Sequence, residues 1–187
     1  PWGRYPDSMG GRTKDLYRDL LAVGTSLLSF IEKETPPEVR KGFSLPLDEM
    51  VTDSGSNLLR VINYPAIGGN ESPGAIRADA HCDINLITVL VAGSQPGLQV
   101  MLKDKTWVDV KCDPSLIVIN TGDMLQECSG GYYPSTVHRV IKPESERDNV
   151  PRLSMPMFIH PRDEVMLSDR YTAGEYLNQR LREIGLR

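Results

Sequence analysis

The pattern of apolar and polar residues changes once, about a third of the way along the chain. Between Thr13 and Lys33, apolar residues recur at steps of three and four, which is the period of one face of an α-helix. These residues are Leu16, Leu20, Val23, Leu27 and Ile31. From 34 to 55, acidic residues and prolines break the period, so we expect turns and a short helix there. The first third therefore predicts one long helix whose stripe faces a core.

After Gly55, short apolar runs alternate with clusters of Gly, Pro, Asp and Asn, which is typical of β-strands separated by turns. The runs predict strands near residues 57–64, 80–91, 98–102, 106–110, 115–120, 135–142 and 152–159. A last amphipathic helix is expected over Ala173–Ile184. Many short strands at this spacing indicate a sandwich or barrel. The predicted fold is mainly β with flanking α, a jelly roll with an N-terminal bracing helix and a C-terminal helix.

The length of 187 residues fits one folded domain. Within it we expect a helical support over 1–56 and, over 57–187, a jelly-roll core that includes the last helix. The sequence starts without Met, so we expect the N-terminal support to be incomplete.

Composition and charge argue against nucleic acid and membranes as partners of the chain. It is 40% hydrophobic and 25% charged, which is ordinary for a globular protein, and its net charge of −4 argues against a nucleic-acid-binding surface. The most apolar runs have the length of strands and not of membrane spans, and the start has no apolar core like that of a signal peptide. We therefore expect a cytoplasmic protein that binds neither membrane nor nucleic acid. The sequence does not set the oligomeric state.

The cysteines favour neither disulfides nor a zinc site. Cys82, Cys112 and Cys128 are an odd number and have no CxxC spacing. We expect reduced thiols. Cys82 lies between two candidate ligands, and on a strand its side chain would point away from them.

Two of the three histidines and one aspartate suggest a metal site. His81 precedes Asp83 by two residues, so a strand would place both side chains on one face, and His138 could complete the set from another strand. Two imidazoles and a carboxylate leave positions open on an octahedral iron(II) ion. Zinc is the competing metal, but hydrolytic zinc sites usually carry a nearby Glu base, as in HExxH, and no such motif adjoins these residues. The HxD pair alone is weak evidence.

Arg152 and Ser154 add a candidate anion site. They lie two apart on a predicted strand, so both can face one carboxylate, which the guanidinium would bind by a two-pronged contact. A buried Arg without an anion is costly, so an inward-facing Arg152 predicts an acidic ligand. The alternative is a surface arginine on an edge strand.

Four ordered segments of the chain resemble one known family, the isopenicillin N synthase-like family of 2-oxoglutarate- and iron(II)-dependent dioxygenases. The segments are HCDINLITVL (81–90), GLQVMLKDKTWVDVK (97–111), IVINTGDMLQECSGGYYPSTVHRV (117–140) and RLSMPMFIHP (152–161). The resemblance is colinear from about Leu58 to Pro161. It implies a double-stranded β-helix, which is the jelly roll expected above.

The resemblance also implies a role for each candidate site residue. The implied catalytic iron ligands are His81, Asp83 and His138. The implied contacts of the distal carboxylate of 2-oxoglutarate are Arg152, Ser154 and the hydroxyl of Tyr64, the tyrosine before proline in VINYP. With Fe(II), 2-oxoglutarate and O2, such a protein hydroxylates or otherwise oxidises a small organic substrate and releases succinate and CO2.

The chain departs from the family pattern in places that affect the substrate. Cys82 stands where the family often has Thr, Ile62 stands where many plant members have Asn, and the loop 142–151 is longer than usual. Pro156 is unusual within a strand because it cannot donate to the sheet. The usual N-terminal segment is not recognisable. The prime substrate therefore stays open.

Several alternatives remain. The chain could be an iron oxidase that takes no 2-oxoglutarate, like isopenicillin N synthase or the ethylene-forming plant oxidase, or a non-catalytic jelly-roll binding module. We expect Asn120, Gly122 and Asp123 to shape a turn rather than contact a ligand. We expect His160 not to be a ligand.

Overall fold

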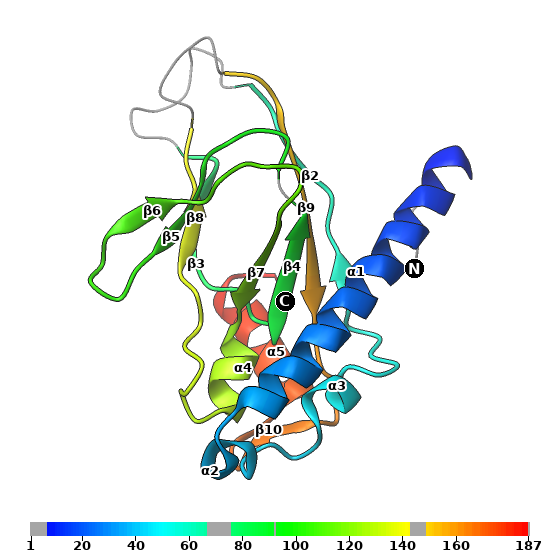
Figure 1. Ribbon diagram of the computed structural model, residues 1–187, viewed down its shortest axis with the longest axis vertical. Coiled ribbons are helices and arrows are strands. Elements are labelled where there is room, and N and C mark those ends of the chain that lie inside the picture. The colour runs from blue at the N-terminus through cyan, green and yellow to red at the C-terminus, as the bar shows by residue number, and fades with distance from the viewer. Residues whose placement is uncertain (1–6, 67–75, 92, 143–148, 187) are drawn as a thin grey trace.

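The computed structural model describes residues 7–66, 76–91, 93–142 and 149–186 (Figure 1). The helices are α1 (Asp7–Glu34), α2 (Pro37–Arg40), α3 (Leu47–Met50), α4 (Asp123–Cys128) and α5 (Ala173–Glu183). The strands are β1 (Leu58–Leu59), β2 (Ile62–Tyr64), β3 (Ala78–His81), β4 (Ile87–Val91), β5 (Leu98–Met101), β6 (Trp107–Asp109), β7 (Ile117–Thr121), β8 (His138–Val140), β9 (Arg152–Ile159), β10 (Met166–Ser168) and β11 (Tyr171–Thr172).

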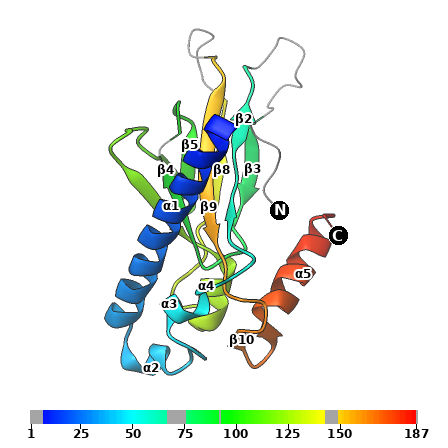
Figure 2. The ribbon, with the colours of Figure 1, turned by 90° about the vertical axis from the view of Figure 1, so that its right-hand side faces the viewer.

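The strands form two main antiparallel sheets. The five-stranded sheet has the order β1-β9-β4-β7, with β2 also paired to β9, and the four-stranded sheet has the order β3-β8-β5-β6. A small hairpin joins β10 to β11. Figure 2 shows α1 and α5 on opposite sides of the strands. The predicted mainly β fold with a helix at each end is confirmed.

Helix α1 packs across the five-stranded sheet, and the contact is centred on a glycine. A Cβ atom at Gly24 would lie 1.9 Å from Cδ1 of Ile159 in β9 and 3.1 Å from Cγ2 of Val89 in β4. Leu20 and Leu28, one turn before and after Gly24, are 3% and 0% exposed.

The predicted stripe of this helix is wrong at one position. Val23 is 37% exposed, while Leu28, which the stripe omitted, is buried. The contact face runs through Gly24, and a glycine gives no apolar signal in the sequence.

Two predicted strands are each interrupted in the structure. The run 57–64 divides into β1 and β2 opposite Pro156 of β9, whose carbonyl accepts a hydrogen bond of 3.0 Å from the amide of Arg60. Because proline has no N–H, Pro156 cannot donate the reciprocal hydrogen bond to the carbonyl of Arg60, and the β-ladder is interrupted there. Strand β9 itself covers the predicted range 152–159.

The predicted strand 80–91 stops at His81 and resumes at Ile87, because α4 binds the segment between them. The amides of Asp123 and Met124 donate to the carbonyls of Asp83 and Ile84 at 2.8 and 3.1 Å. These first amides of α4 have no acceptor within the helix. The carbonyls of the segment 82–86 accept from them, and the segment therefore does not pair with a strand.

The last helix is confirmed, since α5 covers Ala173–Glu183. It begins with a capping box in which the hydroxyl of Thr172 accepts from the amide of Glu175, and the Glu175 carboxylate accepts from the amide of Thr172. In the part of the chain that the structure describes, no helix combines the length and apolar character needed to cross a bilayer.

Candidate metal and cosubstrate site

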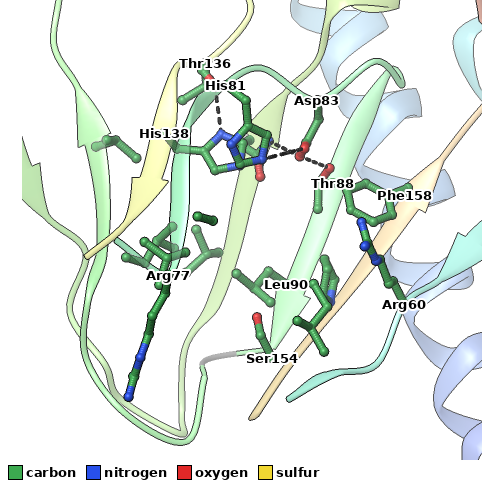
Figure 3. Close-up of a pocket in the computed structure, with 18 of the residues that line it drawn as sticks. Arg60, Arg77, His81, Asp83, Thr88, Leu90, Thr136, His138, Ser154 and Phe158 are labelled. Carbon is green, nitrogen blue, oxygen red and sulfur yellow. Dashed lines mark hydrogen bonds and ion pairs between the residues drawn. The ribbon is translucent and has the colours of Figure 1, made fainter. Parts of the chain in front are cut away.

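A cavity of about 310 Å³ lies between the two sheets and contains the predicted site residues (Figure 3). Its volume is at the lower end of the range for small-molecule pockets, roughly 300–1,000 Å³. The lining side chains include those of His81, Asp83, His138, Arg152 and Ser154. The structure therefore brings these predicted residues together around one cavity.

The three candidate metal ligands converge at one end. One potential ligand atom from each of His81, Asp83 and His138 can be chosen so that all lie within 4.8 Å of one another. His81 and His138 are partners across β3 and β8, with ring centroids 4.3 Å apart. Oδ1 of Asp83 lies 3.9 Å from Nε2 of His81 and 3.7 Å from Nε2 of His138.

The reason given for this convergence from the sequence was partly wrong. His81 ends β3, but Asp83 lies outside any strand, in the segment bound by α4. Its side chain reaches the imidazoles because α4 holds this segment, and not because a strand places alternate residues on one face. Cys82, between them, does not line the cavity, and the grouping of candidate metal ligands among the described residues does not include it.

Both imidazoles are oriented by the backbone of their own strand segments. Nδ1 of His81 lies 2.7 Å from the carbonyl of Asp79. Nδ1 of His138 lies 3.0 Å from the carbonyl of Thr136 (Figure 3). A carbonyl oxygen only accepts, so each Nδ1 carries the hydrogen and each Nε2 lone pair is left for a metal.

The carboxylate of Asp83 is oriented by two side chains that the sequence did not assign to the site. Its Oδ2 accepts from the hydroxyl of Thr88 at 2.6 Å and from Nδ2 of Asn120 at 2.8 Å. Thr88 in turn accepts from Nδ2 of Asn85 at 2.9 Å. These contacts hold Oδ2, so Oδ1 faces the two histidines.

The prediction for the Asn120 segment was therefore wrong in part. Asn120 lies on strand β7 and contacts Asp83 rather than shaping a turn. Gly122 caps α4, and a Cβ there would lie 2.2 Å from the carbonyl oxygen of Asn85. No spacing in the sequence relates Asn120 to Asp83, because their contact depends on the pairing of β4 with β7, which places Asn120 opposite Thr88. Thr88 is only five residues from Asp83, but its contact depends on the chain between them bending instead of continuing as a strand.

The candidate anion site is formed by two residues at the start of β9, Arg152 and Ser154. Arg152 and Ser154 are 2% and 6% exposed, so the alternative of a surface arginine is wrong. Nε of Arg152 donates to the carbonyl of Gln95 at 2.9 Å, and its Nη1 is buried without a partner among the residues described. Burial lowers the pKa of Arg152, although a guanidinium keeps its charge in proteins.

Tyr64 lines the same end of the cavity, and Gly93 lies against the guanidinium of Arg152. Tyr64 pairs with Arg152 across β2 and β9, and its ring centre lies 5.6 Å from Cζ of Arg152. A Cβ at Gly93 would lie 2.6 Å from Nη2 of Arg152. Gly93 was not identified from the sequence, where a glycine before the turn SQPG gives no signal of a ligand site.

His160 is not part of the metal cluster. It is 8% exposed, and burial lowers its pKa. The candidate ligand group found in the described chain consists of His81, Asp83 and His138 alone.

The chemistry of these groups fits an iron(II) ion beside a small dianion. Two oriented imidazole nitrogens and one carboxylate oxygen form an N/O donor set that leaves coordination positions open. A buried guanidinium nitrogen without a partner among the described residues, at the other end of the cavity, calls for an acceptor, because an unpaired buried donor is costly.

The comparisons with known proteins agree with this class of site. The family model of the 2OG-Fe(II) oxygenase superfamily matches residues 56–161. Mugineic-acid 3-dioxygenase of Hordeum vulgare is 33% identical over 164 residues, covering 84% of this chain and 47% of the barley protein.

Two solved structures resemble the whole fold. A crystal structure from Shewanella oneidensis, of a protein provisionally assigned as an oxygenase, has a TM-score of 0.90 and 51% identity, and the match covers 100% of this chain and 68% of that chain. A full-length protein of Neurospora crassa, solved in complex with alpha-KG, has a TM-score of 0.78 and 28% identity, over 98% of this chain and 60% of that one.

The chain belongs to the 2OG-Fe(II) oxygenase superfamily. The predicted jelly roll is confirmed, and the cofactors of the family are iron(II) and 2-oxoglutarate. The chain spans about half the length or less of the curated relatives it matches, for example 47% of mugineic-acid 3-dioxygenase and 31% of a flavonol synthase from Crocosmia x crocosmiiflora.

Proposed function

We propose that this protein is an iron(II)- and 2-oxoglutarate-dependent dioxygenase that oxidises a small organic molecule. One observation supports this best. A single cavity carries an oriented His-Asp-His cluster at one end and a buried guanidinium nitrogen, with no partner among the described residues, at the other. A 2-oxoglutarate molecule has a metal-chelating end and a distal carboxylate, which these two ends would bind.

In this proposal each site residue has one task. His81, Asp83 and His138 hold the iron. Nη1 of Arg152, which has no partner among the described residues, and the hydroxyl of Ser154 bind the distal carboxylate, with Tyr64 beside them. When bound, iron and 2-oxoglutarate supply oxidation by O2, which converts 2-oxoglutarate to succinate and CO2 and inserts one oxygen atom into the substrate.

The protein's own contribution is orientation and enclosure. Thr88 and Asn120 fix which oxygen of Asp83 faces the metal position, and the backbone carbonyls of Asp79 and Thr136 fix both imidazoles. Apolar side chains such as Leu90, Val118 and Phe158 line the cavity and limit the water in it.

The test is oxidation coupled to cosubstrate use. Purified protein with Fe(II) and 2-oxoglutarate should release succinate in step with O2 uptake when a substrate is present. Replacing Arg152 with Gln should raise the 2-oxoglutarate concentration needed by about 10- to 150-fold, because a hydrogen bond to a charged group contributes about 1.5–3 kcal/mol. Iron binding, measured by anaerobic titration, should persist in this variant.

Other outcomes would point to the alternatives. O2 uptake without succinate would indicate an iron oxidase that takes no 2-oxoglutarate. Failure to bind iron, with no O2 uptake, would indicate a non-catalytic jelly-roll module. A wild-type affinity of Arg152→Gln for 2-oxoglutarate would remove Arg152 from the site.

For the substrate and the cellular location, we propose only a general class. Relatives are named for mugineic acid, flavonols and gibberellin, all small molecules, and we infer a small-molecule substrate here. A cytoplasmic location is also proposed, supported by three free cysteines, as is common in reducing compartments.

A further inference from the structure

The side chains that line the cavity would keep a net positive charge after iron and 2-oxoglutarate have bound. Among its described lining residues are three arginines, Arg60, Arg77 and Arg152, and one carboxylate, Asp83. The charge of a ferrous dication is cancelled by that of the 2-oxoglutarate dianion, and Asp83 offsets one guanidinium. Two guanidinium charges therefore remain in the loaded site that we propose.

Arg77 is partly engaged and lies away from the metal ligands, although its Nε is buried without a partner among the described residues. Its Nη2 donates to the carbonyl of Val150 at 2.8 Å. In Figure 3 its guanidinium lies at the far end of the side chain from the two histidines. This arginine therefore adds positive charge to the electrostatic field of the cavity, but its hydrogen bond to Val150 holds the guanidinium away from the metal ligands.

Arg60 is the arginine that remains available near the metal ligands. It lies between β1 and β2, and its backbone amide bonds the carbonyl of Pro156, which fixes its position beside β9. Its side chain is exposed and lines the cavity, and Figure 3 shows it beside Phe158, on the side of Thr88 and Asp83. No hydrogen bond or ion pair of this guanidinium is found within the described part of the chain.

Two positions along β9 thus present different cation sites: Arg152 at its start, and Arg60 beside Pro156 in its middle. Arg152 is 2% exposed and held by Gln95, so it suits a cosubstrate that is the same in every turnover. Arg60 is exposed to solvent and also lines the cavity, so it suits a substrate that enters the loaded site from solvent.

Apolar side chains also line the cavity on the Arg60 side. Phe158 lies beside Arg60 in Figure 3, and Leu90 and Pro156 are further apolar lining residues of the same cavity. A ligand that satisfies both features has a carboxylate for the guanidinium and an apolar body for these side chains.

We propose that Arg60 binds the carboxylate of the prime substrate, which is a small organic acid with an apolar body. This inference rests on the proposed function and names the substrate class for the same cavity. A neutral substrate is the competing outcome; the Neurospora crassa protein, for example, has also been solved with thymine, which is uncharged at neutral pH.

The test compares acids with their own amides. The protein is loaded anaerobically with Fe(II) and saturating 2-oxoglutarate, and calorimetry measures binding of phenylacetate, 3-phenylpropionate, cinnamate and octanoate, each beside its primary amide. Saturating 2-oxoglutarate keeps the probes away from Arg152. We expect acids to bind at least about tenfold more tightly than their amides, as a charge-assisted hydrogen bond implies.

Variants then assign the effect to Arg60. Arg60→Gln should lower the affinity for the acids by about 10- to 150-fold and change that for the amides by less than about threefold. Arg60→Lys, which keeps the charge but loses the planar fork, should recover part of the affinity. Arg182→Gln, on the exposed face of α5, makes the same change in net charge and should leave the acid–amide difference unaltered.

Three results would overturn the inference: no acid binds, the amides bind as tightly as the acids, or Arg60→Gln leaves acid binding intact. Iron and 2-oxoglutarate binding are measured first on the same samples. If both bind and the acids do not, the assignment of Arg60 fails while the proposed function stands. If iron and 2-oxoglutarate do not bind, the proposed function fails.

Discussion

Asp83 has two carboxylate oxygens in different surroundings, and this difference defines the candidate metal site at the scale of single residues. Oδ2 accepts hydrogen bonds from Thr88 and Asn120, while Oδ1 faces Nε2 of His81 and His138. A carboxylate held in this way offers one oxygen to a metal rather than two. Its orientation is set by neighbours that are not ligands, which is a common arrangement in metal proteins.

Asn120→Ala should therefore weaken iron binding without removing a ligand. Loss of such a supporting hydrogen bond typically lowers metal affinity by about 10- to 100-fold. Anaerobic Fe(II) titration of the two proteins measures the change. Asn63→Ala, at an exposed position of β2, is the matched control and should bind iron like the wild type. An unchanged affinity in Asn120→Ala would show that Thr88 alone is enough to hold Asp83.

Gly93→Ala should weaken 2-oxoglutarate binding while sparing iron. The added methyl carbon would lie 2.6 Å from Nη2 and 2.8 Å from Cζ of Arg152, and the buried guanidinium has to move away from it. We expect a loss of at least about tenfold in 2-oxoglutarate affinity, since displacement weakens a charge-assisted contact. Titration of the iron-loaded protein under nitrogen measures this loss. Gly55→Ala meets no atom within 4 Å and serves as the control; equal behaviour of the two variants would refute the close contact.

At the scale of elements, the packing of α1 on the sheet gives a prediction with opposite signs at two glycines. Gly24→Ala places a Cβ 1.9 Å from Cδ1 of Ile159, which is fully buried, so the core has to shift at a cost of about 1–3 kcal/mol. Gly11→Ala, in the same helix, meets nothing within 4 Å and should stabilise the protein by about 0.5–1 kcal/mol. Urea unfolding measures both changes. Stabilisation by Gly24→Ala would mean that the helix does not pack so closely.

The elements also show what the sequence could and could not predict. Strand β9 and helix α5 follow a period that their own residues carry, and both were predicted within one residue of their ends. The run 80–91 has the apolar residues of one strand, but its interruption depends on amides of α4, about forty residues later. The candidate ligand set could be proposed from the sequence because residue types indicate ligands. Thr88, Asn120 and Gly93 could not, because their contacts with Asp83 and Arg152 depend on how the chain folds.

At the scale of the whole molecule, the two sheets are stabilised differently. The buried core lies around the five-stranded sheet and includes Leu28 of α1, Val89 of β4 and Met157 of β9. Within the described chain, the four-stranded sheet contributes no residue to this core cluster. It faces the five-stranded sheet across the cavity, where His81 and His138 come from one sheet and Asp83 precedes a strand of the other. A metal ion bound to all three would therefore join the sheets.

Hydrogen exchange can test this role of the metal. Without iron, the four-stranded sheet should open at a lower free energy than β4 and β9, because it lacks the core. Iron at about 100 times its Kd stabilises the closed state by about 2.7 kcal/mol, so exchange should slow by about 100-fold. The slowing should extend to β6, which carries no candidate ligand, because it is held to β8 through β5. Asp83→Ala should show no such slowing. If protection increases at β3 and β8 but not at β6, the metal orders its ligands without stabilising the sheet as a unit.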